Sequence, residues 1–468
     1  MSDAKTATAA VYSEQSSQED YGLHAGALGP LETLAQSVSA MAPSTSPSLT
    51  IPLVFAMAGN ATWLVYLLAT GATLVVGFCV SRFARLSASP GSLYTYTADT
   101  LPQIFGVVAG WGLLIAYLAT GASVAGGALY YTSLLAQQFL HWVPPTPLTL
   151  TIVCLVAGFV AYRDVKLSAE LMLWIEICSL SLIFIVLTVM LIRNGLHLDM
   201  EQFRLRDVSF SALGPALVLS MFSFVGFESA TTLGGEARNP LRTIPRAVIQ
   251  CAIIAGVFFM LCSYSEVLGF RGESGKLSDT TSPLHLLASK AGVSPLGIGI
   301  DFGAFISMIA CVLACVTAAS RVLMRMAHEK LLPPVFERTS PVHGTPVAAI
   351  VLSIGMIFLG TIVMALRGIS GSDVYDLMGS LSVFGFLTAY ALVAIALPFA
   401  RRARGRHSHL VVAVSVLAAL VVVLIGVFDL RSTADAAHVR LPYFYLLYIA
   451  GGLAWYATRR KSMLAVNP

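Results

Sequence analysis

Two carboxyl groups interrupt long apolar stretches of this sequence and could bind and release protons. Glu176 lies within "LMLWIEICSLSLIF", and Glu228 lies within "MFSFVGFESATTL". A lone carboxylate among apolar side chains is costly unless it is protonated, paired or hydrated, and burial favours its neutral form. Each group could therefore exchange a proton with water. The alternative for Glu176 is a permanently protonated group that hydrogen-bonds a neighbouring helix.

Hydroxyl side chains and prolines mark a second group of candidates, in the stretch "AMAPSTSPSLTIP" at positions 40–52. An interior proline removes an N–H donor and clashes with the preceding turn, so Pro43 and Pro47 should break a helix. Gly226, two residues before Glu228, also weakens a helix. In lipid, the backbone groups freed by such a break must face protein, water or a ligand. Both stretches are therefore candidates for a polar binding site.

The elements that position these residues are predicted to be membrane-spanning helices. The chain has 468 residues, of which 57% are hydrophobic and 11% charged, and its mean hydropathy is +0.80. A soluble chain would be about a quarter charged, and about twenty apolar residues cross a bilayer as a helix. These figures predict an all-α polytopic membrane protein with twelve spans, near 31–55, 62–81, 104–134, 148–162, 168–192, 212–234, 246–270, 296–326, 346–366, 376–399, 409–428 and 441–458.

The two predicted breaks fall in spans one and six, five spans apart. This spacing indicates an inverted repeat in which residues 31–192 form the first half, residues 212–399 form the second, and residues 409–458 add two spans. In transporters of this kind, the ends of the broken helices hold the substrate near the middle of the bilayer. The alternative is a proline kink in one span and a packing glycine in the other.

Charge and composition outside the spans predict how the chain is oriented. Placing the N-terminus in the cytoplasm leaves nineteen of the 28 Lys and Arg residues inside, which fits the positive-inside rule. The prediction is a multi-pass protein of the cytoplasmic membrane with both termini cytoplasmic, a disordered tail over residues 1–29 and a transporter domain over residues 30–468. The seven cysteines fall inside the predicted spans, where we expect them to pack as small apolar side chains.

Several other classes of function are disfavoured by the sequence. The nine histidines are scattered among loops and span ends, so no metal site is predicted. The net charge of +4 needs no nucleic-acid partner, because it follows from the orientation of the spans. No cluster of catalytic groups lies at one interface, so we expect neither an enzyme nor a cofactor. A channel would need a continuous pore lined by charges or carbonyl groups, whereas aromatic residues flank the break in span six.

Three longer motifs give the chain a resemblance to a known family. They are "FSFVGFESATTLGGEARNPLRTIPRAVI" at 222–249, "SRFARLSASPGSLYTYTADTLP" at 81–102 and "ASRVLMRMAHEKLLPPVFERTSPVHGTPVAA" at 319–349. The first resembles the Phe-x-Gly-Phe-Glu, Glu-x-x-Asn-Pro and Ile-Pro-Arg-Ala signature of the amino acid, polyamine and organocation (APC) permeases. The other two are similar to loops of that family after spans two and eight. The resemblance covers about residues 30 to 400.

This resemblance implies a LeuT-like fold with a 5+5 inverted repeat, broken helices one and six, and secondary transport of an amino acid or related amine. It also implies alternating access, driven by protons or by exchange. The sequence leaves both a monomer and a homodimer open. By analogy, seven residues line the substrate: Ser44, Thr45, Ser46, Phe222, Ser223, Phe224 and Val225. Tyr117, Phe222, Glu228 and Tyr390 match gate positions, with Phe222 as the aromatic gate over the substrate. Glu176 and Glu228 are the candidates for proton coupling.

One departure from the family pattern leaves the substrate and the coupling ion open. Relatives carry a Gly-Ser/Thr-Gly triplet in span one, whose amides receive a carboxylate, whereas this chain has Thr45-Ser46-Pro47 and Pro47 has no N–H. An amine without a carboxylate is therefore the alternative substrate. Sodium is the alternative coupling ion. In relatives it is held partly by adjacent hydroxyls of span eight, and this chain has only the separated Ser307, Thr317 and Ser320 there. The pattern favours protons.

Overall fold

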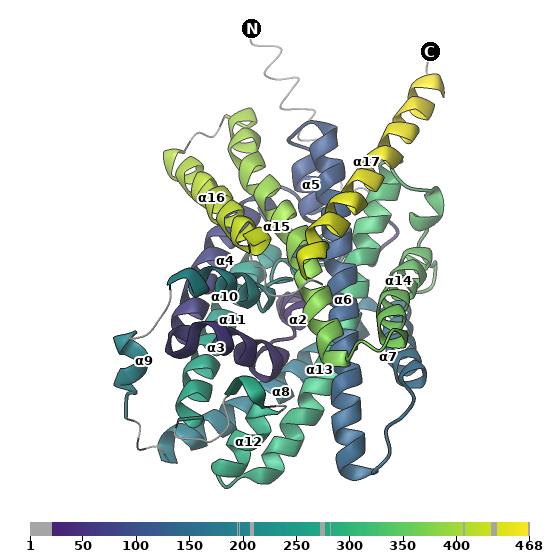
Figure 1. The fold of residues 1–468 in the computed structure, drawn as a ribbon. Helices are drawn as coiled ribbons and strands as arrows, with labels where there is room; N and C mark the ends of the chain where they lie inside the picture. The colour runs from purple at the N-terminus through teal and green to yellow at the C-terminus, as the bar shows by residue number, and fades with distance from the viewer. Residues whose placement is uncertain are drawn as a thin grey trace.

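The computed structural model describes residues 21–193, 195, 197–205, 210–271, 277–280, 282–405, 408–431 and 438–466. Over this part, the chain is a bundle of helices without a strand (Figure 1). One end of the bundle carries α5 and the last turns of α17, and we call it the α5 end. The opposite end carries α12, and we call it the α12 end (Figure 1).

The helices of the first half of the chain are α2 (Pro30–Met41), η1 (Ser46–Thr50), α3 (Ile51–Ala58), η2 (Gly59–Ala61), α4 (Thr62–Ala84), α5 (Leu93–Ala98), α6 (Gln103–Phe139), α7 (Thr146–Arg163), α8 (Val165–Arg193) and α9 (Met200–Arg204). Those of the second half are α10 (Phe210–Phe222), η3 (Ser229–Leu233), α11 (Pro240–Gly269), η4 (Leu277–Asp279), α12 (Pro283–Lys290), α13 (Ser294–His328), η5 (Pro334–Phe336), α14 (Val347–Leu366), α15 (Gly371–Ala403), α16 (His409–Arg431), η6 (His438–Arg440) and α17 (Leu441–Val466).

Nine stretches of the described chain are long and apolar enough to cross a membrane. The first, Pro30–Ala84, contains both the first and the second predicted span. The predicted span at 212–234 corresponds to a shorter apolar helix, Ala212–Phe222, followed by a non-helical segment. The expectation of a multi-pass, all-helical membrane protein is thus confirmed.

Both predicted breaks are present in the backbone. Helix α2 ends at Met41, Ala42 adopts a left-handed conformation with φ of 46°, and a π-helical turn, η1, leads into α3. Helix α10 ends at Phe222, and a turn containing Gly226 leads into η3. Gly226 has φ of +92°, and a Cβ atom there would lie 2.9 Å from the carbonyl oxygen of Ala40. Only glycine combines this conformation with so close a contact, so the two broken helices touch through backbone.

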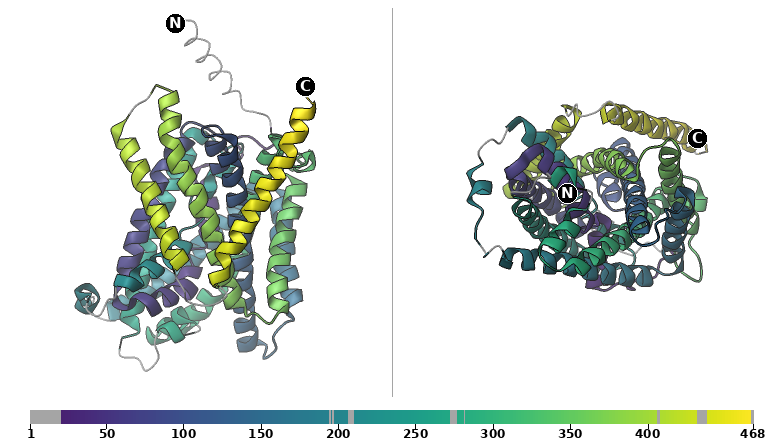
Figure 2. Two further views of the ribbon diagram at one scale, coloured as in Figure 1. Left: turned by 45° about the horizontal axis from the view of Figure 1, so that its top comes forward. Right: turned by 60° about the horizontal axis from the view of Figure 1, so that its bottom comes forward.

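Long helices surround the two breaks. Helix α2 contacts α8, α11 and α13, and it also contacts η3 of the second break. Outside this centre, α6 packs against both α13 and α15, and α11 packs against α4. Figure 2 shows α15, α16 and α17 running side by side along one flank of the bundle, and α15 contacts the other two. The breaks therefore lie inside the helical body.

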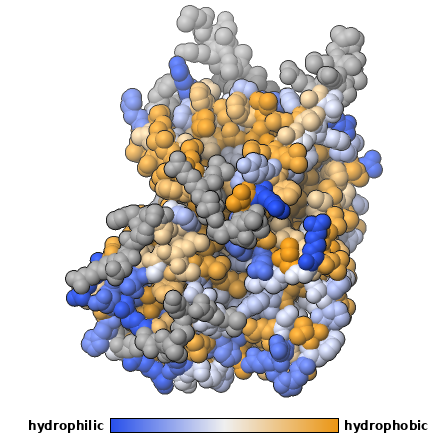
Figure 3. Space-filling view, viewed as in Figure 1, coloured by the Kyte–Doolittle hydropathy of each residue, from blue (hydrophilic) through white to orange (hydrophobic). Residues whose placement is uncertain are grey.

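The outward faces of the bundle are apolar. Figure 3 shows apolar side chains over much of one face, and residues such as Leu155, Phe159, Leu420 and Val423 are exposed. Large exposed apolar faces are costly in water and are normal where lipid covers them. Six of the seven cysteines are buried as expected, but Cys178 on α8 is exposed beside Trp174. The expectation that every cysteine packs inside is therefore wrong for Cys178, because this face of α8 points out of the bundle.

Residues 21–29 lie against the helical body at its α5 end. The Leu28 N–H donates to the Glu236 carbonyl oxygen at 3.1 Å, and the Leu28 carbonyl accepts from the Arg238 N–H at 2.7 Å. The Leu28 side chain is fully buried, and Tyr21 contacts Arg325 through its hydroxyl group. The first twenty residues of the predicted tail lie outside the described residues.

Candidate functional site

The break in span one presents buried hydroxyl groups. Ser44, Thr45 and Ser46 are all buried, and the Ser44 and Ser46 hydroxyls have no hydrogen-bond partner among the described residues. The Thr45 hydroxyl donates to the Ala42 carbonyl at 2.8 Å and lies 3.4 Å from the Tyr375 hydroxyl. Buried polar groups are nearly always hydrogen-bonded, so the Ser44 and Ser46 hydroxyls at this helix break are suited to hold a polar ligand.

The side chains at the break in span six point in different directions. The Ser223 hydroxyl lies 3.2 Å from the Tyr66 hydroxyl of α4. The Phe224 ring packs against Phe259 of α11, with 5.1 Å between ring centroids. Val225 is also buried. Of these predicted substrate residues, Phe224 thus faces the α4–α11 interface with its ring, so only its backbone can line the break.

Phe222 lies at the end of α10 and packs on α15. Its ring is 5.3 Å from that of Tyr375 in an edge-to-face arrangement, and a Cβ atom at Gly379 would lie 2.7 Å from the Phe222 ring. The Tyr375 hydroxyl in turn lies 3.1 Å from that of Thr50 in η1. Tyr375 therefore joins both breaks. Sequence reasoning missed it because it precedes the predicted tenth span by one residue.

A substitution at Gly379 tests whether the position of the Phe222 ring matters for substrate binding. Gly379→Ala is expected to push the ring away from the break and to weaken substrate binding, and the overpacking itself should destabilise the fold by about 1–3 kcal/mol. The measurement is the half-saturation concentration for counterflow in proteoliposomes. Gly355→Ala in α14 is the matched control, because a Cβ atom there has nothing within 4 Å. Unchanged counterflow by Gly379→Ala would show that the position of the ring is irrelevant to the substrate.

Three predicted gate residues come together at the second break. The Tyr117 hydroxyl donates to Glu228 Oε1 at 2.9 Å, and the Tyr390 hydroxyl donates to Oε2 at 2.6 Å. All three side chains are buried. The Phe227 ring packs on Tyr390 with 5.5 Å between centroids. The carboxyl group of Glu228 thus ties α6 and α15 to the second break, a contact that has to change if these helices separate.

Glu176 lies at a different place, beside the first break. The Ser307 hydroxyl of α13 donates to Glu176 Oε1 at 2.7 Å, and Oε2 has no hydrogen-bond partner among the described residues. Ser39 of α2 faces the same carboxyl group. The side chain is buried. Glu176 therefore contacts the helices on both sides of it and retains one oxygen without a partner.

Other buried polar groups were not singled out from the sequence. Gln36 of α2 donates to the Ser229 hydroxyl at 2.8 Å and to the Ala314 carbonyl at 2.9 Å, so it joins α2, η3 and α13. Glu236 and Arg321 form a buried ion pair. Glu266 of α11 is fully buried, and neither of its carboxyl oxygens has a partner among the described residues. Glu266 was visible as a carboxyl group inside the predicted seventh span, which was the signal available for it.

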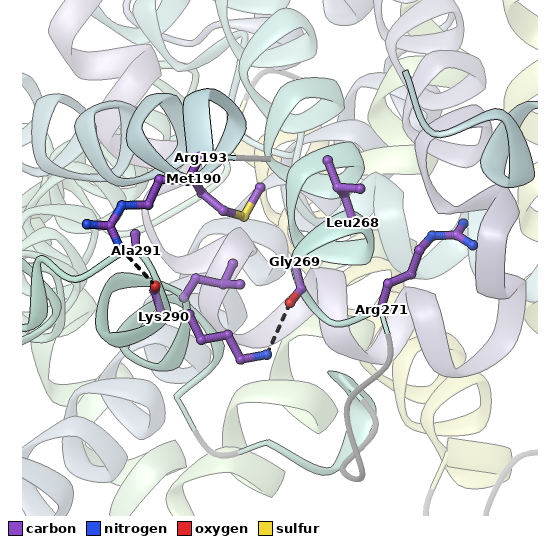
Figure 4. A pocket seen from close by; sticks show the side chains of 8 residues that line it. Met190, Arg193, Leu268, Gly269, Arg271, Lys290 and Ala291 are labelled. Atoms are coloured by element: carbon purple, nitrogen blue, oxygen red, sulfur yellow. Dashed lines mark hydrogen bonds between the residues drawn. The ribbon is translucent and has the colours of Figure 1, made fainter. Parts of the chain in front are cut away.

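A cavity of about 350 Å³ lies at the α12 end, away from the predicted site residues (Figure 4). The Lys290 ammonium group donates to the Gly269 carbonyl at 3.1 Å, and Arg193 donates to the Lys290 carbonyl at 3.5 Å. Three lining residues are cationic and none is acidic; the lining comprises Met190, Arg193, Leu268, Gly269, Arg271, Leu287, Lys290 and Ala291. Among the described residues, no group of three His, Cys, Asp or Glu side chains could hold a metal ion.

Membrane helices that break at their middle and present buried polar groups there are the architecture of secondary transporters. The fold agrees with this class. A solved structure of a manganese transporter from Eremococcus coleocola matches with a TM-score of 0.58 over 92% of this chain and 93% of that chain, at 12% sequence identity. The family model for amino acid permeases matches residues 43–456. The chain belongs to the amino acid permease family, which confirms the resemblance found in the motifs.

Relatives with about the same sequence identity to this chain are named for different substrates. The branched-chain amino acid permease BcaP of Bacillus subtilis is 24% identical over 365 residues, which is 74% of each chain. The methylthioribose transporter of the same organism is 25% identical over 362 residues, again 74% of each. Cationic amino acid transporter 4 of Mus musculus is 26% identical over 383 residues, which is 78% of this chain and 58% of that protein. Family membership therefore supports amino acid transport without naming the substrate.

Proposed function

We propose that the protein is a secondary active transporter that carries an amino acid across the cytoplasmic membrane in symport with protons. Twelve spans in a 5+5 inverted repeat, with both termini cytoplasmic, would alternate access to a site between the two breaks. The observation that carries the proposal is the contact between the two broken helices, with the unpartnered hydroxyls of Ser44 and Ser46 on one side and Glu228 on the other.

The hydroxyl groups of the first break would replace the backbone amides that relatives use for a carboxylate. Pro47 has no N–H, and the Thr45 N–H already donates to the Ala42 carbonyl at 2.9 Å. Ser44 and Ser46 each have an O–H donor without a partner among the described residues. Hydrogen bonds from hydroxyls to a carboxylate are short and strong. We therefore assign the substrate carboxylate to these two serines.

Glu176 would be the proton-coupling group. It lies between α13 and the broken α2, and one of its oxygens has no partner among the described residues. The span-eight residues do not favour sodium, because the hydroxyl groups of Ser307, Thr317 and Ser320 are separated along α13 and do not form the adjacent pair that holds sodium in relatives. A sodium site needs several free oxygen ligands. This arrangement supports protons over sodium.

An amine without a carboxylate is the second candidate substrate. The observation that favours it is Pro47, which removes an amide from the triplet that receives carboxylates in relatives. Glu228 would then bind the amine, because its two oxygens accept only one hydrogen bond each from Tyr117 and Tyr390. The two candidate substrates thus differ in the break that binds their charged group. The first break would bind the carboxylate of an amino acid, and Glu228 in the second break would bind an amine.

The proposal is tested by counterflow in proteoliposomes. A panel of labelled amino acids and matched decarboxylated amines is offered with and without a pH gradient and with and without sodium. We expect saturable counterflow of at least one amino acid and accumulation that follows the pH gradient. Counterflow of amines alone would support the second candidate, and accumulation that follows only the sodium gradient would refute proton coupling.

Replacing Thr45-Ser46-Pro47 by Gly-Ser-Gly separates the two candidate substrates. The change restores unhindered amides at the end of a half-helix, which favours anions. We expect binding of an amino acid to be kept or improved by about 1 kcal/mol, the usual size of one net hydrogen bond, as measured by equilibrium binding. Improved binding of an amine together with loss of amino acid binding is the contrary result.

A further inference from the structure

Glu266 is a buried carboxyl group that the proposed function does not use. Its side chain has no exposed surface, and neither oxygen has a hydrogen-bond partner among the described residues. It lies in α11, three residues before the end of the helix at Gly269. Its backbone carbonyl is occupied, because it accepts from the Phe270 N–H at 3.1 Å. The group without a hydrogen-bond partner is therefore the side-chain carboxyl and not the backbone carbonyl.

The complete burial of the Glu266 carboxyl group limits which ligand this group can bind. An isolated carboxylate in an apolar surrounding costs so much that the group takes up a proton instead. A neutral carboxyl group without a hydrogen-bond partner is still destabilising. Neither oxygen has room for a metal ion or an organic cation, because neither has accessible surface. A proton is the one ligand that needs no additional space.

Polar groups connect Glu266 to the second break. Tyr66 of α4 and Cys262 of α11 lie close enough to the Glu266 carboxyl group to interact with it electrostatically. The Tyr66 hydroxyl lies 3.2 Å from the hydroxyl of Ser223, which follows Phe222 in the break. Glu266 is thus linked to the break through Tyr66, whereas Glu228 lies within the break and accepts hydrogen bonds from Tyr117 and Tyr390.

The cavity at the α12 end approaches Glu266 from the other direction. Gly269 lines this cavity (Figure 4), and residues three apart lie on the same face of a helix. Leu287 of α12 packs over Gly269, where a Cβ atom would lie 2.3 Å from it. The cavity therefore ends one helical turn from Glu266, at the point where Leu287 packs on Gly269.

We propose that Glu266 is a second proton-binding site of the transport cycle, loaded from the α12 end and linked to the second break through Tyr66 and Ser223. Loading adds a proton from water at the α12 end to a carboxylate oxygen of Glu266, and unloading returns that proton to water, so only the charge of Glu266 changes. Tyr66, which lies near Glu266, would pass this change of charge to the break through its hydrogen bond with Ser223. This inference rests on the proposed function only in assuming that protons are coupled to a substrate.

Infrared difference spectroscopy of the protein in liposomes observes the carboxyl group directly. Spectra with and without substrate are recorded for the wild type, Glu266→Gln and the matched control Glu176→Gln. We expect the substrate to change a protonated-carboxyl band that shifts in D₂O and is absent in Glu266→Gln, yet persists in Glu176→Gln. A difference spectrum that Glu266→Gln leaves unchanged overturns the proposal.

The pH dependence of substrate binding provides a second measurement. Each linked proton changes log affinity by about one per pH unit, so we expect Glu266→Gln to reduce this slope by about one near the pH at which the group titrates. Tyr66→Phe should also reduce this slope, because it removes the hydroxyl group that contacts Ser223, while the protonated-carboxyl band remains. Melting temperature serves as the folding control, because Gln preserves the shape. Equal slopes for the wild type and Glu266→Gln contradict the inference, whereas a wild type that binds no amino acid or amine contradicts the proposed function instead.

Discussion

Glu176→Gln is expected to abolish accumulation driven by a pH gradient while exchange of substrate continues. Gln keeps the shape of the side chain and can still accept the hydrogen bond from Ser307, which lies 2.7 Å from Glu176 Oε1. It cannot ionise, so its charge cannot change between the two sides of the membrane. One proton per substrate and a gradient of one pH unit supply about 1.4 kcal/mol, or about tenfold accumulation. We expect this to fall to equal concentrations on both sides.

The measurement compares two assays on the same proteoliposomes. Counterflow reports binding and alternating access without net proton movement, and gradient-driven uptake reports coupling. Wild-type counterflow in Glu176→Gln shows that the protein is folded and active. If uptake by this variant still rises as the external pH is lowered, the coupling role passes to Glu228 or Glu266, and Glu176 is a structural hydrogen-bond acceptor.

Removing one partner of the Glu236–Arg321 ion pair is expected to destabilise the protein by about 3–5 kcal/mol, because it leaves an uncompensated buried charge. Arg321 binds both carboxylate oxygens, with Nε to Oε2 at 2.7 Å and Nη2 to Oε1 at 2.6 Å. The exposed fractions of the two side chains are 1% and 0%. Arg321 also donates to the Thr317 carbonyl at 3.0 Å. The pair thus joins the segment before α11 to α13.

Thermal unfolding of purified Arg321→Met, Glu236→Gln and the double variant checks this expectation. The double variant should recover much of the loss, because it removes both charges together. Lys166→Met is the matched control: Lys166 and Glu170 form an exposed pair at 3.7 Å, and such pairs contribute about 0–1 kcal/mol. Single variants as stable as this control would mean that water reaches the pair.

The breaks could be predicted from the sequence because their causes are local. Pro43 and Pro47 have no backbone N–H group in any structural context, and Gly226 readily adopts a backbone conformation that other residues avoid. The grouping of Tyr117, Glu228 and Tyr390 came from the resemblance to relatives, since nothing in their spacing brings three distant helices together. Its geometry agrees with that expectation, while the gate role stays a prediction.

Other parts of the site depend on contacts that local sequence does not encode. Tyr375 meets Thr45 and Thr50 across more than three hundred residues of chain, and Arg321 meets Glu236 across 85. The direction of the Phe224 ring could not be predicted from the sequence either, because the side chains of consecutive residues in an irregular turn follow neither the helical nor the strand period. The polar partners of a buried residue become visible only when the packing of the helices is known.

The burial of six cysteines makes this chain suited to chemical labelling without first removing its own thiols. Cys178, the exposed one, lies on an apolar face beside Trp174, where lipid would shield it from water-soluble reagents. A single cysteine introduced at exposed His141, between α6 and α7, or at Arg404, after α15, would then be the main thiol that an impermeant maleimide can modify. Reaction from outside the cell at position 141 but not at position 404 would establish which way the bundle faces.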